Sequence, residues 1–120
     1  MSTDQPATMS REDLATEVQG KIRNQPVILF MKGTPDAPYC GFSMRTVQAL
    51  DSIGASYSAV NVLADPRIRE VLSEQSDWPT IPQLFVDGTL VGGCDIVTEM
   101  AESGELKELI GSASGGASPA

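Results

Sequence analysis

The 120-residue sequence predicts a single α/β domain in which helices flank both faces of a four-stranded mixed sheet. Two observations carry this prediction. The apolar run Val27–Met31 is typical of a strand buried on both faces, and a helix and a second strand are expected to follow it. Further along, Asp87 and Gly88 separate two apolar segments, which is a strong signal for a tight hairpin. We therefore expect one parallel pair of strands and an antiparallel hairpin.

The first expected element is a helix that begins after Ser10. Ser10 is a favourable N-cap residue, and the acidic residues that follow it suit the first helical turn. Leu14, Val18 and Ile22 then recur on one helix face. Residues 1–9 are expected to form a flexible N-terminal tail.

A loop is expected between the first strand and the second helix. Residues 33–39 contain two prolines, an aspartate and a glycine, all of which favour loops. The helix is expected to begin near Cys40 and to end at Gly54. Its predicted inward-facing residues are Met44, Val47 and Leu50.

The second strand is expected within residues 56–63, which include the alternation typical of a strand. Asp65 followed by Pro66 predicts the start of a third helix, because Asp is a good N-cap and Pro suits the first helical position. The predicted inner face of this helix comprises Ile68, Val71 and Leu72.

The C-terminal part is expected to contain the hairpin strands, at 84–86 and 90–91, followed by two helices. Asp95 is the expected cap of the first helix, and Gly104 separates it from the second. The second helix contains Leu106, Leu109 and Ile110. The last ten residues, 111–120, consist of Gly, Ser, Ala and Pro and are expected to form a flexible tail.

The predicted order α-β-α-β-α-β-β-α-α places the folded domain at residues 10–110. A right-handed crossover joins the parallel strands, and the hairpin completes the sheet. This arrangement is similar to the thioredoxin-like fold.

Charge and composition exclude several classes of function. The net charge of −8 and the pI near 4.3 disfavour nucleic-acid binding. The sequence contains no histidine, which excludes Cys-His nucleophile pairs and His-ligated metal sites.

The longest apolar run is too short to span a membrane, and residues 1–9 lack the pattern of a targeting signal. Two cysteines do not form a disulfide framework, so we expect a soluble protein in a reducing compartment, the cytoplasm.

Cys40 is the strongest candidate for chemistry. A cysteine that opens a helix lies near free backbone N–H groups and the positive end of the helix dipole, both of which favour the thiolate. Lys32, at the end of the preceding strand, adds a positive charge. The alternative is a small buried cysteine without chemistry, but a helix start after a Pro-rich loop favours exposure.

The segment from Cys40 to Ser43 resembles the Cys-x-x-Cys motif of thiol-disulfide oxidoreductases, with Ser43 in the place of the second cysteine. In dithiol enzymes that second thiol resolves the mixed disulfide formed by the first. Ser43 cannot do this. Cys40 must therefore use an external thiol or Cys94, or serve another purpose.

Four short motifs and a dipeptide together identify the family that the chain resembles. They are Met31-Lys32-Gly33, Cys40-Gly41-Phe42-Ser43, Ile68-Arg69, Trp78-Pro79-Thr80-Ile81-Pro82-Gln83 and Gly92-Gly93-Cys94-Asp95. In this order they resemble a monothiol glutaredoxin of the single-domain CGFS type, over about residues 10–110. The resemblance implies a thioredoxin-like fold and a site for glutathione.

The resemblance assigns Lys32 and Arg69 to the glycine-end carboxylate of glutathione, which suits the planar fork of an arginine. The alternative for both is solvated surface charge. Trp78 and Pro79 are interpreted as structural support for the loop that follows them.

Thr80, Ile81 and Pro82 form the next part of the implied glutathione site. In the family this proline is cis, so that glutathione can pair with the Ile81 main chain, whereas the alternative is that Pro82 only shapes a turn. Cys94 and Asp95 open a helix whose N–H groups suit the other carboxylate, and Asp95 can accept the α-amine. A simple N-cap role is the alternative for Asp95.

The resemblance further implies a labile 2Fe-2S cluster as the cargo. Such a cluster takes four thiolates, and two Cys40 side chains with two glutathione sulfurs supply them in a homodimer. Cys94 is then not needed as a ligand, and its backbone contacts suffice. The seven residues between Lys32 and Cys40 are, in the family, taken to favour cluster binding over disulfide exchange. Cluster transfer to apo iron-sulfur acceptor proteins and pairing with BolA-type proteins are implied as well.

Three hypotheses of function follow. The first is a glutathione-dependent 2Fe-2S carrier. The second is a glutathione-dependent oxidoreductase that removes glutathione from protein mixed disulfides through Cys40, with at most weak activity in the absence of a resolving cysteine. The third is a redox sensor in which Cys40 and Cys94 form a disulfide, which requires Cα atoms within about 7 Å.

Overall fold

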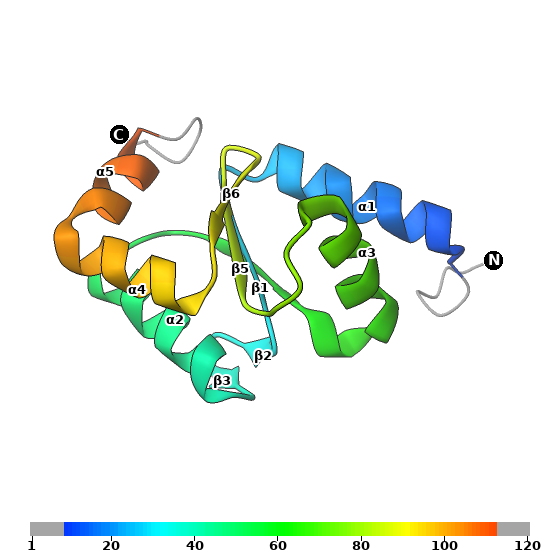
Figure 1. The fold of residues 1–120 in the computed structure, drawn as a ribbon, viewed down its shortest axis with the longest axis horizontal. Coiled ribbons are helices and arrows are strands. Elements are labelled where there is room, and N and C mark those ends of the chain that lie inside the picture. The colour runs from blue at the N-terminus through cyan, green and yellow to red at the C-terminus, as the bar shows by residue number, and fades with distance from the viewer. Residues whose placement is uncertain (1–8, 113–120) are drawn as a thin grey trace.

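In the computed structural model, which describes residues 9–112, a four-stranded sheet separates two layers of helices (Figure 1). The strand order is β4-β1-β5-β6. β1 pairs in parallel with β4 and antiparallel with β5, and β5 pairs antiparallel with β6. The predicted mixed sheet with helices on both faces, the thioredoxin-like arrangement, is confirmed.

The bounds of the elements agree closely with those expected. The sheet comprises β1 (Val27–Met31), β4 (Ser58–Asn61), β5 (Gln83–Val86) and β6 (Thr89–Gly92). The helices are α1 (Arg11–Asn24), α2 (Gly41–Ser52), α3 (Pro66–Ser76), α4 (Cys94–Ser103) and α5 (Glu105–Gly111), with a 3-10 turn, η2 (Val62–Ala64), before α3. The predicted tails lie outside the described residues, except for Met9, Gly111 and Ser112.

All five residues of β1 are buried, and they alternate between two cores. Val27, Leu29 and Met31 face the core that is closed by α2, α4 and α5. Ile28 and Phe30 face the core that is closed by α1 and α3. The continuous apolar run is therefore explained by helices on both sides of the central strand (Figure 1).

The predicted helix caps and hairpin turn are confirmed at three places. The Ser10 hydroxyl accepts the Asp13 N–H at 3.0 Å and caps α1. Asp65 caps α3 and is followed by Pro66 at the first helical position. Asp87 and Gly88 both have positive φ, 54° and 80°, which is the conformation required by the tight turn between β5 and β6.

Three expectations were wrong in detail. Residues 33–39 are not a plain loop, because β2 (Gly33–Thr34) and β3 (Ala37–Pro38) pair as a short hairpin. Met44 is exposed rather than inward-facing, because the buried stripe of its helix passes through neighbouring positions. Asp95 is not the N-cap of α4: Gly93 is, and it provides no side-chain cap. Within residues 9–112, no helix is long and apolar enough to cross a membrane.

Candidate functional site

Cys40 is the N-cap residue of α2, and its side chain is half-buried. Its extended backbone, with φ −147° and ψ 159°, ends the 33–39 hairpin and turns the chain into the helix. The sulfur accepts the backbone N–H of Ser43 at 3.4 Å, as a capping oxygen would. The thiol therefore lies among the free N–H groups of the helix start, as predicted.

Ser43 is fully buried and connects the thiol to the end of β1. Its hydroxyl oxygen accepts the backbone N–H of Lys32 at 3.1 Å and lies 3.5 Å from the Cys40 sulfur. Because an oxygen lone pair is engaged by Lys32, the hydroxyl proton is available to the sulfur. The residue in the place of a resolving cysteine thus serves as a hydrogen-bond donor to the thiolate.

These contacts lower the pKa of Cys40 below that of an ordinary thiol. Burial is the largest influence and acts in the opposite direction, since it disfavours the charged sulfur. It is outweighed by hydrogen bonds from the Ser43 hydroxyl and from the backbone N–H groups of Ser43 and Phe42, and the charge of Lys32 adds to them. The expected activation without histidine is therefore present in the geometry.

The β2–β3 hairpin fixes the path from Lys32 to Cys40. The Lys32 carbonyl accepts the Tyr39 N–H at 2.9 Å, which closes the hairpin at its base. Gly33 has φ +91°, and a Cβ at this position would lie only 2.5 Å from the Ala37 carbonyl oxygen. Only glycine allows this close approach, so Gly33 brings the strand end and the thiol together.

Lys32 and Arg69 line the same surface pocket, of about 640 Å³, beside Pro79. Lys32 is half-buried at the end of β1, and Arg69 is exposed on α3. Within residues 9–112 neither side chain forms an ion pair, so both cations are available to a ligand carboxylate. The carboxylate of Glu70, which lines the same pocket, lies 3.8 Å from the guanidinium of Arg11 and forms an ion pair with it.

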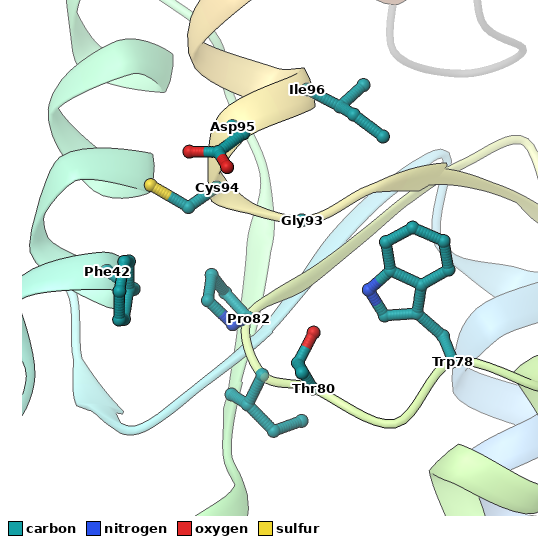
Figure 2. Close-up of a pocket in the computed structure, with 9 residues that line it drawn as sticks. Phe42, Trp78, Thr80, Pro82, Gly93, Cys94, Asp95 and Ile96 are labelled. Atoms are coloured by element: carbon teal, nitrogen blue, oxygen red, sulfur yellow. The ribbon is translucent and has the colours of Figure 1, made fainter.

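The loop before β5 forms the wall of a second pocket, of about 400 Å³ (Figure 2). The Ile81–Pro82 peptide bond is cis, as the family resemblance implied. Thr80, Ile81 and Pro82 all line this pocket. Trp78, expected only to support the loop, also lines it.

Gln83 is a supporting residue whose role the sequence did not reveal. Its side chain is fully buried, and its amide nitrogen donates to the carbonyl oxygens of Trp78 at 2.8 Å and of Thr80 at 3.1 Å. Both bonds hold the 78–82 loop from inside the protein. The only sequence signal was a polar residue at the start of an otherwise apolar strand.

Cys94 and Asp95 lie in the first turn of α4, across the pocket from Thr80 (Figure 2). Since Gly93 lacks a capping side chain, the first N–H groups of α4 are available to an anion. A Cβ at Gly93 would lie 3.2 Å from the Pro82 carbonyl oxygen, so glycine keeps this wall close to the loop. Cys94 is buried, Asp95 is exposed, and Cys94 and Cys40 are both free thiols.

The structure thus gathers the predicted site residues into two adjacent groups that share the 78–82 loop. Thr80, Ile81, Pro82, Cys94 and Asp95 line one pocket, and Lys32 and Arg69 line the other. Cys40 lines neither, although Phe42, two residues further along, reaches the first pocket. A Cys40–Cys94 disulfide stays a prediction.

The fold and its helix-start thiol define the class of this molecule, a thioredoxin-like protein with one active-site cysteine. A glutaredoxin family model matches residues 27–91. The chain is 51% identical over 94 residues to Glutaredoxin 4 of Escherichia coli (strain K12), which covers 78% of this chain and 82% of that relative. The chain belongs to the glutaredoxin family.

Further similarities refine this assignment. Monothiol glutaredoxin-5, mitochondrial, of Saccharomyces cerevisiae is 49% identical over 108 residues, covering 84% of this chain and 72% of that relative. Among solved structures, a buckwheat glutaredoxin-glutathione complex superposes with a TM-score of 0.72 at 25% identity, covering 82% of this chain and 88% of that chain. With Ser43 in place of a second cysteine, the chain is a monothiol glutaredoxin.

Proposed function

We propose that this monothiol glutaredoxin binds glutathione and carries a labile 2Fe-2S cluster between two protomers, for storage or transfer to acceptor proteins. The observation that carries the proposal is the activated, half-buried Cys40 thiol, whose neighbours Phe42 and Lys32 each line a pocket with groups that match one end of glutathione. The proposed compartment is the cytoplasm, because both cysteines are free thiols.

Glutathione matches the site at three places. Its glycine carboxylate suits the cations of Lys32 and Arg69, and its backbone suits the Ile81 main chain before the cis Pro82. Its γ-glutamyl end carries a carboxylate and an amine, which suit the N–H groups at the start of α4 and the Asp95 side chain. A solved relative, the buckwheat glutaredoxin, is a complex with glutathione, which supports the same ligand here.

Ligands from outside one protomer are needed for the cluster. Among the residues that the structure describes, no three Cys, His, Asp or Glu side chains gather to hold a metal ion. A 2Fe-2S cluster takes four thiolate ligands, so one Cys40 and one glutathione sulfur from each of two protomers complete the set. The stabilised thiolate of Cys40 is the form that binds iron.

Three exposed hydrophobic side chains near Cys40 in the sequence support contact with a second protomer. Tyr39 is 78% exposed, Phe42 57% and Met44 45%, and all three lie within four residues of Cys40. The Arg45 guanidinium lies 5.8 Å from the centre of the Phe42 ring. BolA-type proteins and apo iron-sulfur proteins are proposed as further partners of this surface on the family resemblance.

Anaerobic reconstitution with iron, sulfide and glutathione tests the carrier function. Wild-type protein should gain the visible absorption of a 2Fe-2S cluster and sediment as a dimer, whereas Cys40→Ser should stay colourless and monomeric. Cys94→Ala is the matched control, because it removes the other thiol and should retain the cluster. The proposal would be contradicted if wild type and Cys40→Ser stayed equally colourless and monomeric after reconstitution.

A second candidate function is deglutathionylation, which the lowered pKa of the Cys40 thiol favours. The Cys40 thiolate would attack the glutathione sulfur of a protein mixed disulfide and release the protein thiolate, leaving glutathione on Cys40. A second glutathione would then attack that disulfide and release oxidised glutathione. Rapid turnover of a glutathionylated protein, lost in Cys40→Ser and kept in Cys94→Ala, would favour this enzyme function over cluster transport.

A further inference from the structure

Asn61, the last residue of β4, holds two backbone N–H groups with one side-chain oxygen. Its Oδ1 accepts the N–H of Gly33 at 2.9 Å and the N–H of Leu63 at 2.9 Å. The first bond crosses to the strand end that follows Lys32, and the second starts the η2 turn. The half-buried Asn61 side chain is therefore a junction between two segments that are far apart in sequence.

The two segments joined by Asn61 both contribute to the wall of the 640 Å³ pocket. Gly33 directly follows Lys32, which lines that pocket. Leu63 lines it as well and belongs to η2, which leads into α3 and Arg69. One oxygen atom thus bonds both the residue that follows Lys32 and the η2 turn that leads into the helix of Arg69.

Two further hydrogen bonds hold the backbone N–H and carbonyl groups of Lys32. The Lys32 N–H donates to the Ser43 hydroxyl at 3.1 Å, and the Lys32 carbonyl accepts from Tyr39 at 2.9 Å. The backbone pairing of β1 with β4 matches Met31 to Asn61 and holds the strand before Lys32. The Asn61 side chain continues this link past Lys32, to Gly33. Without it, the backbone of Lys32 would stay fixed to the thiol side but lose this direct hydrogen-bonded link to the Arg69 side.

We propose that Asn61 is a positioning residue that sets the spacing of Lys32 and Arg69, so that both cations reach a single terminal carboxylate of the thiol ligand. This inference rests on the proposed glutathione site. It adds that Asn61, through the spacing of the two cations, makes the site selective for a ligand that ends in a carboxylate. Asn61 acts through these two segments and does not line the pocket itself. An acceptor oxygen at this position is the chemical requirement.

The test compares glutathione with its glycine carboxamide, which keeps the thiol and the γ-glutamyl end but lacks the terminal carboxylate. Binding of each is measured by titration calorimetry to wild type and to Asn61→Ala. The Ala variant should bind glutathione about tenfold more weakly, the order of one charged hydrogen bond. Its affinity for the carboxamide should change less than twofold, because that ligand makes no ionic contact with Lys32 and Arg69.

Two further variants separate positioning from folding. Asn61→Asp keeps the acceptor oxygen and should restore the preference for the free carboxylate. Asn61→Ser keeps a short hydroxyl that can cap Leu63 but cannot extend to Gly33, so it should lose the preference while η2 is preserved. If the Ala variant does not fold, as judged by thermal unfolding, the Ser variant carries the test. Asn24→Ala, at the exposed end of α1, is the control.

The outcomes distinguish this inference from the proposed function. If wild-type protein binds neither ligand, the glutathione site itself is wrong, and the role of Asn61 fails with it. If wild type prefers glutathione and the folded Ala or Ser variant keeps the same preference, the positioning role is overturned while the glutathione site stands. Equal weakening of both ligands would show a general structural role and would overturn the inference too.

Discussion

The hydroxyl of Ser43 lies 3.5 Å from the sulfur of Cys40, at the position where a dithiol relative carries its second sulfur. In a dithiol protein this position attacks a mixed disulfide, whereas here its hydroxyl donates a hydrogen bond to the thiolate form of Cys40. The hydroxyl also accepts the Lys32 N–H, which fixes its position. The residue in the place of the resolving thiol therefore stabilises the Cys40 thiolate.

Replacing Ser43 with Ala should raise the pKa of Cys40, because the hydroxyl that stabilises the thiolate is removed. Lys32→Gln should raise it less, because the charge of Lys32 is the weakest of the contributing influences. The thiolate absorbance near 240 nm, followed against pH in a Cys94→Ala background, measures both shifts. Ser52→Ala is the control, because the Ser52 hydroxyl donates to Ala49 within the same helix.

The rate of Cys40 alkylation should follow the same titration. The thiolate is the reactive form, so the rate in wild type should rise with pH through a midpoint below the ordinary thiol value of 9.0 and level off above it. In Ser43→Ala the midpoint should move upward. A midpoint that stays in place in this variant would show that the hydroxyl does not stabilise the thiolate.

Ser43→Ala should also destabilise the fold. The substitution leaves the Lys32 N–H without its acceptor in a buried environment, which costs about 1–3 kcal/mol. Urea denaturation measures this free energy of unfolding. The exposed control Ser52→Ala should change it by about 0.5 kcal/mol or less.

Gln83→Leu should loosen the cis-proline loop. The substitution leaves the carbonyl oxygens of Trp78 and Thr80 without their donor, with an expected cost of about 1–3 kcal/mol in the free energy of unfolding. Glutathione affinity, measured by calorimetry, should fall as well, because Thr80 lines the proposed site. Gln75→Leu, which removes an exposed bond to Ala15, should leave stability within about 0.5 kcal/mol and affinity unchanged. Full affinity in Gln83→Leu would show that the loop keeps its shape without the amide.

The fold was predictable from sequence wherever one residue sets the local structure. Ser10 and Asp65 cap helices through their own side chains, and the turn at Asp87 and Gly88 needs only its own backbone. The five buried residues of β1 likewise imply cover on both faces. Met44 was misplaced, because helical spacing alone does not show which of two adjacent stripes meets the sheet.

The residues that hold the site together were less predictable. Ser43, Asn61 and Gln83 act through backbone groups 11, 28 and up to 5 positions away, and nothing in the sequence names those partners. Cys40, Lys32 and Arg69 were identified because motif resemblance and charge point to them directly. The polar supports become visible only when the fold shows which carbonyl and N–H groups lack other partners.

Stability should depend on pH through Asp65, the cap of α3. Hydrogen bonds from the Arg67 side chain and backbone N–H lower the pKa of this carboxyl in the folded protein below its usual value of 3.8. The resulting stabilisation is present above the unfolded-state pKa and is lost as pH falls through the lower folded-state pKa. Asp65→Asn keeps a capping oxygen without this titration, so the advantage of wild type in melting temperature should shrink as pH falls below about 4. An advantage that is constant down to pH 2 would contradict the assignment.

Reversing the charge of Arg69 tests the carboxylate end of the proposed site. Arg69→Glu should weaken glutathione binding by about tenfold or more, because a carboxylate would face the carboxylate of the ligand. Reconstituted cluster should be lost faster for the same reason, whereas circular dichroism should stay unchanged, because Arg69 is exposed on α3. Lys107→Glu makes the same change in net charge on α5, which does not line either pocket, and should leave binding intact. If both variants weaken binding equally, the effect is one of overall charge and Arg69 does not contact the ligand.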